Sequence, residues 1–144
     1  CDPGYITINK YQTADNQQRV LRNAALGTPA GFVFESTFAC LLPASANDAN
    51  TLAVFEMYKA SISDYAYVVD PAERISLIQN GYVENGILGR ANNYNSYVRL
   101  KQCYQAANNI HNWVYQHEAC PSGYAEELVE QVLSGLHRPR TICS

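Results

Sequence analysis

Stretches in which apolar and polar residues alternate recur three times along the chain, and a polar turn follows each of them. The stretches are residues 5–11, 52–58 and 98–104. An alternation of period two is typical of a strand with one buried face. A second short strand is expected after each turn and is clearest at residues 65–69 and 111–115. The pattern therefore predicts three β-hairpins.

The three hairpins align as copies of one unit. A tyrosine closes the first strand of each copy, and these residues, Tyr11, Tyr58 and Tyr104, are 47 and 46 residues apart. The copies align without gaps through the turn and into the second strand. We place the units at about residues 5–43, 52–90 and 98–144. A unit of this size cannot bury its own apolar face, so three units are expected to close around a shared centre.

A helix is expected between the second strand of a unit and a third strand that begins at a glycine. In the second unit, Asp70-Pro71 is a typical helix start, Gly81 is a typical end, and Ile75, Leu77 and Ile78 form an apolar stripe. The third unit is expected to open a helix at Ser122 or Gly123. The stripe of that helix is Leu128, Val129, Val132 and Leu133. The first unit has room for one turn at residues 22–27.

These elements predict a mainly β fold with short helices. The 144 residues, at 16.0 kDa, match the usual size of one domain with one core. We expect a single domain over residues 1–144, built from three tandem strand–strand–helix–strand units. Their closure is expected to be pseudo-threefold, of the β-trefoil or pinwheel kind.

The composition favours a protein that acts outside the cell. Only 16% of the residues are charged, against about 25% in typical domains, and 11 are tyrosines. The net charge is -3 and no window gathers Lys and Arg, which argues against a nucleic-acid partner. No apolar run reaches the roughly 20 residues of a membrane span, and no charged and apolar leader stands at the start. We therefore expect a processed, secreted protein without a membrane span.

Five cysteines, Cys1, Cys40, Cys103, Cys120 and Cys143, leave one without a partner if two disulfides form. Cys103 and Cys120 flank a predicted hairpin, so we expect them to pair. Cys143 is expected to pair with Cys40, or alternatively with Cys1. Cys1 would then be the odd cysteine, either joined to another chain or modified by a lipid. In the remaining alternative Cys1 pairs within the chain, and Cys40 or Cys143 is a buried free thiol.

Aromatic residues in the second strands are the candidate binding residues. Because strand side chains alternate, Tyr65 and Tyr67 share one face, as do His111, Trp113 and Tyr115. Aromatic faces flanked by Asn and Gln can hold sugar rings, which suggests a lectin-like, carbohydrate-binding surface. The alternative is that these rings pack in the core, where small domains place most of their aromatic residues.

Signatures of enzymes are missing from the sequence. It contains no GxSxG, HExxH, phosphate-binding glycine loop or dinucleotide fingerprint. Glu35, Glu73 and Glu84 are carboxylates, but nothing in the sequence brings any two together for glycoside hydrolysis. A zinc set of Cys103, His111, His117 and Cys120 has the right residue types with unusual spacing. We expect neither a catalytic site nor a metal or other cofactor.

The predicted function is therefore a non-enzymatic extracellular binding module whose partner is a glycan or another cell-surface molecule. The alternative is a structural protein, either a building block of an extracellular polymer or an accessory subunit of a larger secreted assembly. Low charge favours such association, and an unpaired Cys1 would supply a covalent link between copies.

The second unit resembles a repeat of unknown function found in secreted bacterial, fungal and invertebrate proteins. That repeat reads roughly Y-R-F-Y-N, then G-D-H-F-Y-T-T-D-P-A-E, then G-Y-x-x-E-G-I-A. The matching segments are Val54-Phe-Glu-Met-Tyr58, Asp64-Tyr-Ala-Tyr67, Asp70-Pro-Ala-Glu73 and Gly81-Tyr-Val-Glu-Asn-Gly-Ile87. The likeness is good over residues 52–90 and partial in the other units. It implies architecture and secretion rather than chemistry.

The His-Phe-Tyr cluster of that repeat is not kept in every unit. In a gapless alignment it falls on Gln18-Arg19-Val20, Tyr65-Ala66-Tyr67 and His111-Asn112-Trp113. Only the third unit keeps the histidine. A site repeated three times would therefore have been lost at least once in this chain.

Overall fold

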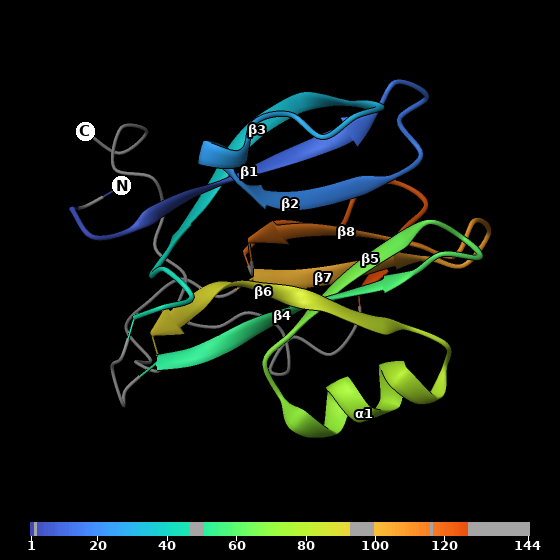
Figure 1. The fold of residues 1–144 in the computed structure, drawn as a ribbon. Coiled ribbons are helices and arrows are strands. Elements are labelled where there is room, and N and C mark those ends of the chain that lie inside the picture. Colours follow the sequence, from blue (N-terminus) through green and yellow to red (C-terminus); the bar gives the residue numbers. More distant parts are fainter. Residues whose placement is uncertain (2, 47–50, 93–99, 116, 127–144) are drawn as a thin grey trace.

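The computed structural model describes residues 1, 3–46, 51–92, 100–115 and 117–126 (Figure 1). These residues form three antiparallel sheets of three strands each, together with one α-helix and one 3-10 helix. The strands are β1 (Ile6–Thr13), β2 (Arg19–Asn23), β3 (Phe32–Leu41), β4 (Thr51–Lys59), β5 (Asp64–Val68), β6 (Val83–Asn92), β7 (Leu100–Gln105), β8 (Ile110–Tyr115) and β9 (Ala125–Glu126). The expectation of a mainly β fold is confirmed.

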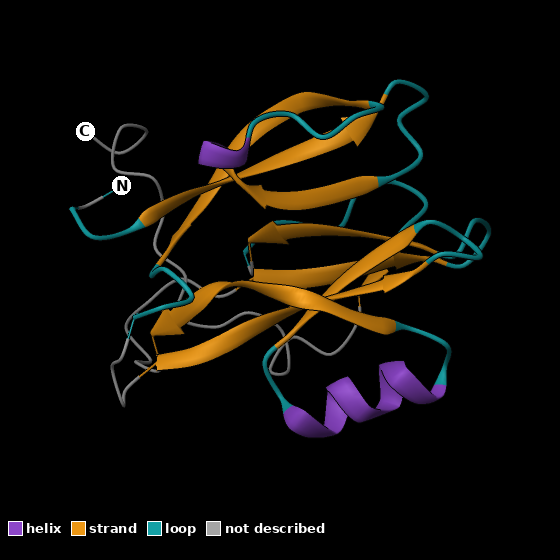
Figure 2. Cartoon of the chain, in the orientation of Figure 1, coloured by secondary structure: helices purple, strands orange, loops and turns teal. Residues whose placement is uncertain are grey.

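Each sheet comes from one segment of the chain, and its first strand lies in the middle. The strand orders are β2-β1-β3, β5-β4-β6 and β8-β7-β9. In Figure 2, drawn in the same orientation as Figure 1, the first sheet lies at the top of the view, β7 and β8 lie in the middle, and β4 and β6 lie below them. Over the described ranges the strands do not close into a barrel.

The turn between the first two strands has one feature in common in all three sheets. A residue five positions after the tyrosine adopts a left-handed backbone: Asn16 (φ 63°), Ser63 (φ 51°) and Asn109 (φ 53°). Asn is among the residues that best tolerate this region. The three first turns therefore share one backbone conformation at the same distance from the tyrosine.

The first hairpin is two residues longer than the other two. Tyr11 pairs with Val20, whereas Tyr58 pairs with Tyr65 and Tyr104 pairs with His111. The gapless alignment of the first unit with the other two is therefore wrong after the turn between the first two strands. The positions that correspond to Tyr65-Ala66-Tyr67 are Val20-Leu21-Arg22, because the extra residues lie in the turn ahead of β2.

Helix α1 (Pro71–Gln79) begins as the sequence predicts. The Asp70 side chain accepts a hydrogen bond from the Ala72 N–H at 3.0 Å, and Pro71 occupies the first turn. The prediction that Ile75, Leu77 and Ile78 form one apolar stripe is wrong, because the side chains of Ile75 and Ile78 are 54% and 51% exposed. They lie three residues apart on the outer face, and only Leu77 packs against the sheet beneath. No helix in the described residues is long and apolar enough to cross a bilayer.

Of the other two helical expectations, the one for the first unit is confirmed and the one for the third unit is wrong at its start. The first unit has a 3-10 helix, η1 (Ala24–Leu26), as the short segment suggested. In the third unit no helix opens at Ser122 or Gly123. There the chain turns, with a hydrogen bond from Tyr124 N–H to Pro121 O, and enters β9 beside β7. The expected stripe Leu128, Val129, Val132 and Leu133 lies outside the described residues.

One hydrophobic core joins the three sheets. Its buried members include Leu21 and Leu41 from the first sheet, Val54 and Tyr67 from the second, and Trp113 from the third. A smaller cluster lies under α1 and contains residues of the second sheet with Tyr82. The three sheets therefore bury apolar side chains against one another.

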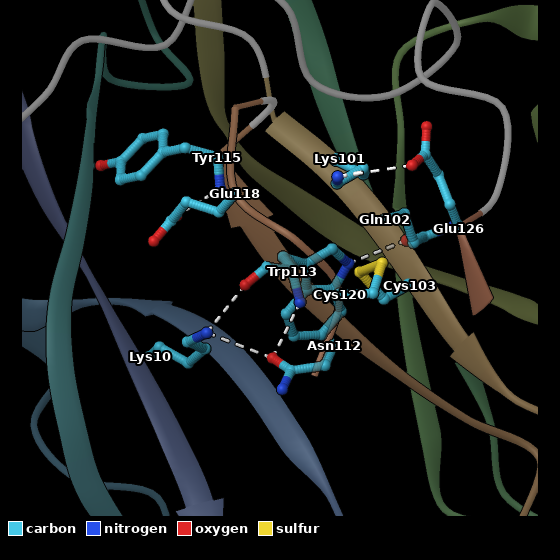
Figure 3. Close-up of a disulfide and its surroundings, with 10 residues drawn as sticks. All are labelled: Lys10, Lys101, Gln102, Cys103, Asn112, Trp113, Tyr115, Glu118, Cys120 and Glu126. Carbon is cyan, nitrogen blue, oxygen red and sulfur yellow. Dashed lines mark hydrogen bonds and ion pairs between the residues drawn. A yellow bond between two sulfur atoms is a disulfide. The ribbon is translucent and has the colours of Figure 1, made fainter. Parts of the chain in front are cut away.

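Two disulfides close the fold, and one of them corrects the expected pairing. Cys103 pairs with Cys120 as predicted (Figure 3). Cys1 pairs with Cys40, so the preferred pairing of Cys40 with Cys143 is wrong and Cys1 is not the odd cysteine. The reason is the register of β1 and β3, which sets Ile6 opposite Leu41 and Thr7 opposite Cys40. Cys143 lies outside the described residues.

Candidate functional site

Two of the candidate aromatic residues are fully buried. Tyr67 and Trp113 have no exposed surface and meet edge to face, with ring centroids 5.0 Å apart. Trp113 donates from Nε1 to Gln102 Oε1 at 2.8 Å (Figure 3). Neither ring is accessible to a sugar. Both belong to the hydrophobic core, which was the alternative to a binding role.

His111 and Tyr115 link the third sheet to its neighbours. His111 is buried, with Nδ1 2.5 Å from Asp64 Oδ2 and its backbone N–H donating to Asp64 Oδ1 at 2.9 Å. Tyr82 donates its hydroxyl hydrogen to the same carboxylate. Tyr115 stacks on Phe38 and donates to the Phe38 carbonyl. These contacts are structural, because each satisfies a polar group where two sheets meet.

Tyr65 borders a pocket beside the second sheet. The pocket has a volume of about 290 Å³ and lies between the first and second sheets. We call it the β2–β6 pocket. Its lining includes the side chains of Arg22, Asn23, Glu56, Tyr65, Asn85 and Ile87. Ligand pockets in proteins begin at about this size.

The fold makes this pocket by setting β2 of the first sheet against β5 and β6 of the second. The buried Tyr67 hydroxyl holds the two sheets together, because it accepts from Leu21 N–H at 2.9 Å and lies 2.8 Å from Leu21 O. The same hydroxyl lies 2.7 Å from Glu56 Oε2. Burial, reinforced by the negative charge of Glu56, raises the pKa of Tyr67 well above its ordinary value, so the hydroxyl keeps its proton.

Glu56 is the acidic group of the pocket. Its Oε2 accepts from the Tyr67 hydroxyl, and its Oε1 accepts from Asn85 Nδ2 at 2.7 Å. Burial raises the pKa of the Glu56 carboxyl, while the hydrogen bonds from Tyr67 and Asn85 and the charge of Arg22 partly oppose this effect. Tyr65 lies beside it, and burial together with the Glu56 charge raises its pKa.

Arg22 is the basic group of the pocket. Its Nε is buried and has no hydrogen-bond partner. The other arginines of the described ranges all have one: Arg19 donates to Glu35, Arg74 to Glu84 and Arg90 to Thr51. A buried polar group without a partner in a native fold calls for an explanation.

Two further pockets lie at the other junctions between sheets. One, of about 420 Å³, borders His111, Tyr82 and Tyr104, and another, of about 550 Å³, borders Lys10 and Glu35. In the latter, Lys10 Nζ contacts Glu35 Oε2 at 3.2 Å, Asn112 Oδ1 at 3.1 Å and Trp113 O at 2.8 Å, the last two being drawn in Figure 3. Its three hydrogens are thereby satisfied.

The structure rules out the alternative of a zinc site made by Cys103, His111, His117 and Cys120. Cys103 and Cys120 are joined in a disulfide and cannot act as thiolate ligands. Among the described residues, no group of three His, Cys, Asp or Glu side chains is placed to hold a metal ion.

Sequence reasoning missed Glu56, Arg22 and Asn85. Glu56 had a signal, since a polar residue stands two positions before the tyrosine in every unit: Asn9, Glu56 and Gln102. Arg22 was missed because the gapless alignment shifted β2 by two residues. Asn85 carried no signal, because only folding brings β6 next to β2.

Comparison with known proteins gives one finding. A family model described as a domain of unknown function (DUF5648) matches residues 10–130. No curated protein and no solved structure gives a significant match. The family description is that of an uncharacterised domain and says nothing of repeats or secretion. Since the matched range takes in most of the chain, the protein belongs to the DUF5648 family.

Proposed function

We propose that the chain is a non-enzymatic extracellular binding module that takes a carbohydrate residue in the β2–β6 pocket. The observation that carries this proposal is the convergence of three kinds of group around one pocket: the half-buried ring of Tyr65, apolar side chains such as Ile87, and the polar groups of Glu56 and Asn85. Pockets that bind small molecules combine apolar walls with a few placed polar groups in this way.

The chemistry of the pocket suits a sugar. One face of a sugar ring presents C–H groups, which pack on an aromatic ring or an aliphatic wall. Its hydroxyls both donate and accept, so they can donate to Glu56 and accept from Asn23 or Asn85. Glu56 already accepts from Tyr67 and Asn85, and its two oxygens have about four acceptor positions in all. Two of these positions are left for ligand hydroxyls.

Binding without hydrolysis is favoured by the acids that line the pocket. Canonical glycoside hydrolysis needs a pair of carboxyl groups about 5–10 Å apart across the bond that breaks. Glu56 is the single acidic residue among those that line the β2–β6 pocket. The pocket therefore has an acceptor for hydroxyls and lacks the second carboxyl that a canonical hydrolase uses.

An extracellular setting is supported by the two disulfides. Cys1–Cys40 and Cys103–Cys120 tie down the first and third sheets. Disulfides of this structural kind form and persist in oxidising compartments.

We also infer that the three units are related by approximate threefold symmetry, as in a pinwheel. Each unit forms a sheet with the same strand order and the same left-handed residue in its first turn. Pockets border all three junctions between the sheets. These repeated features are the support for the arrangement.

Titration with oligosaccharides, followed by NMR, tests the function. Tyr65→Ala should abolish or strongly weaken binding of whichever glycans a glycan array selects. Phe34→Ala is the matched control, because Phe34 is an exposed ring outside the pocket and its loss should leave binding intact. An array without hits at high protein concentration, or equal effects of the two substitutions, would contradict the proposal.

A subunit role in an extracellular assembly is the second candidate function. It is supported by the exposed apolar side chains of Ile75, Ile78 and Val83 at α1 and the start of β6. The Cys1–Cys40 bridge opposes the covalent version through Cys1. Sedimentation should show a dimer or larger species that Ile78→Lys returns to monomer. A wild-type monomer at all concentrations would remove this candidate.

A further inference from the structure

We propose that the sugar bound in the β2–β6 pocket is acidic, with its carboxylate paired to the guanidinium of Arg22. The inference rests on the proposed function, because it names the class of sugar that the same pocket takes. It starts from a difference between the three units at one pair of facing positions.

In two units, facing residues on the first and second strands bond to each other. Glu56 faces Tyr67, and the two side chains meet at 2.7 Å. Gln102 faces Trp113, and Trp113 Nε1 donates to Gln102 Oε1 at 2.8 Å (Figure 3). In both cases a ring brings the donor and a side-chain oxygen accepts, so neither buried group is left unpaired.

In the first unit the same positions hold Asn9 and Arg22, and the bond is not formed. Asn9 faces Arg22 across the sheet, yet Asn9 Oδ1 and Arg22 Nε are both buried without a partner. Among the described residues, no other buried side-chain nitrogen or oxygen lacks a hydrogen-bond partner. The first unit therefore lacks the hydrogen bond that the other two units form at these positions, and its Arg22 Nε has no partner.

Arg22 is also one of the residues that a ligand in the pocket would meet. Arg22 lines the β2–β6 pocket, and its charge acts on both Glu56 and Tyr65. Among the described residues it forms no ion pair, whereas Arg19 and Arg74 each form one with a glutamate. A guanidinium offers five N–H donors in a planar fork that matches the two oxygens of a carboxylate.

The pocket as a whole suits a ligand that is acidic at one end and carries hydroxyls at the other. Glu56 would repel a carboxylate placed against it, but its oxygens are held by Tyr67 and Asn85 and accept hydroxyl hydrogens instead. Arg22 then receives the carboxylate. A uronic acid or a sialic acid combines these two groups on a single ring, which a neutral sugar does not.

Calorimetric titration with oligogalacturonate and with its methyl ester tests the inference on the wild-type protein. The ester keeps the ring and the hydroxyls and removes only the charge. Sialyllactose against lactose provides a second pair. We expect the acidic member of at least one pair to bind about tenfold or more tightly than the neutral one, as for a hydrogen-bonded charge pair. The difference should shrink with added salt.

Arg22→Gln should remove this preference while leaving weak binding of the neutral sugar. Arg74→Gln is the matched control, because Arg74 lies on the surface away from the pocket and its loss should leave the preference intact. Equal affinities of the acidic and the neutral member in both pairs, or tighter binding of a sulfated sugar than of the uronate, would overturn the inference and leave the proposed function standing. Failure of every sugar to bind would overturn both.

Discussion

At the scale of single residues, the feature that stands out is the buried hydroxyl of Tyr67. It forms hydrogen bonds with Leu21 of the first sheet and with Glu56 of its own sheet. It therefore holds the two sheets together and positions the Glu56 carboxyl in the pocket. Because burial raises the pKa of Glu56, the folded state holds the proton of this carboxyl more tightly than the unfolded chain does. The stabilisation linked to that proton is present below the ordinary glutamate pKa, about 4.3. It is lost as the pH rises through the raised value.

Glu56→Gln should therefore stabilise the protein at pH 7 and leave it unchanged at about pH 3, where Glu56 is protonated in both states. The amide keeps an acceptor for Tyr67 and carries no charge to be desolvated. Thermal unfolding measured across this pH range checks the expectation. Glu84→Gln, on the surface beside Arg74, controls for the loss of one negative charge. A variant that is less stable at pH 7 would show that Glu56 is stabilised as an anion.

At the scale of elements, the first and second sheets are joined where β3 meets β6. Just beyond the end of β3, Leu42 exchanges two backbone hydrogen bonds with Arg90, at 2.9 and 2.8 Å. Gly89 allows this approach. A Cβ at that position would lie 2.8 Å from Leu42 O and 2.9 Å from Leu41 Cβ, which is too close for either atom. Among the described glycines, Gly89 alone lacks a left-handed backbone, so close contact explains its identity.

Gly89→Ala should destabilise the protein by about 1–3 kcal/mol, as overpacking does, and should expose the amides of Leu42 and Arg90 to hydrogen exchange. Gly86→Ala is the comparison, because its Cβ meets no atom within 4 Å and its cost comes only from a φ of 105°. That variant should leave both amides protected. Unchanged exchange at Leu42 in Gly89→Ala would show that β3 and β6 can accommodate the added methyl group, which contradicts a close contact at Gly89.

At the scale of the whole molecule, three small sheets share one core and the disulfides brace two of them. The Cys1–Cys40 bridge spans 39 residues, and the Cys103–Cys120 bridge spans 17. In the chain-entropy account, the longer loop restricts the unfolded chain more strongly. The first sheet therefore depends more on its disulfide than the third does.

Replacing both cysteines of a pair by alanine should lower the free energy of unfolding by about 4 kcal/mol for Cys1 and Cys40 and by about 3 kcal/mol for Cys103 and Cys120. Denaturant titrations of the two double variants measure this. A loss below about 1 kcal/mol for the Cys1 and Cys40 pair would contradict the bridge.

Much of this architecture was accessible from the sequence, because local patterns carry it. Alternation located the hairpins, Asp70-Pro71 located the start of α1, and proximity paired Cys103 with Cys120. The misjudged features are those that depend on contacts between distant segments. The Cys1–Cys40 pairing follows from the register of β1 and β3, and the pocket follows from the approach of β2 to β6. The position of Arg22 in the pocket was missed because the first hairpin is two residues longer than the others, and a gapless comparison does not detect such a difference.

The Cys1–Cys40 bridge also decides how the molecule would carry a mechanical load. Tension applied at Cys1 passes through the disulfide to Cys40 and bypasses the loop of chain that contains β1 and β2. The force then enters the chain at Cys40, near the end of β3, next to the pairing of Leu41 with Ile6 and the two hydrogen bonds between Leu42 and Arg90. Reduction of the bridge would reroute the force through β1, so resistance to stretching would depend on the redox state of the surroundings.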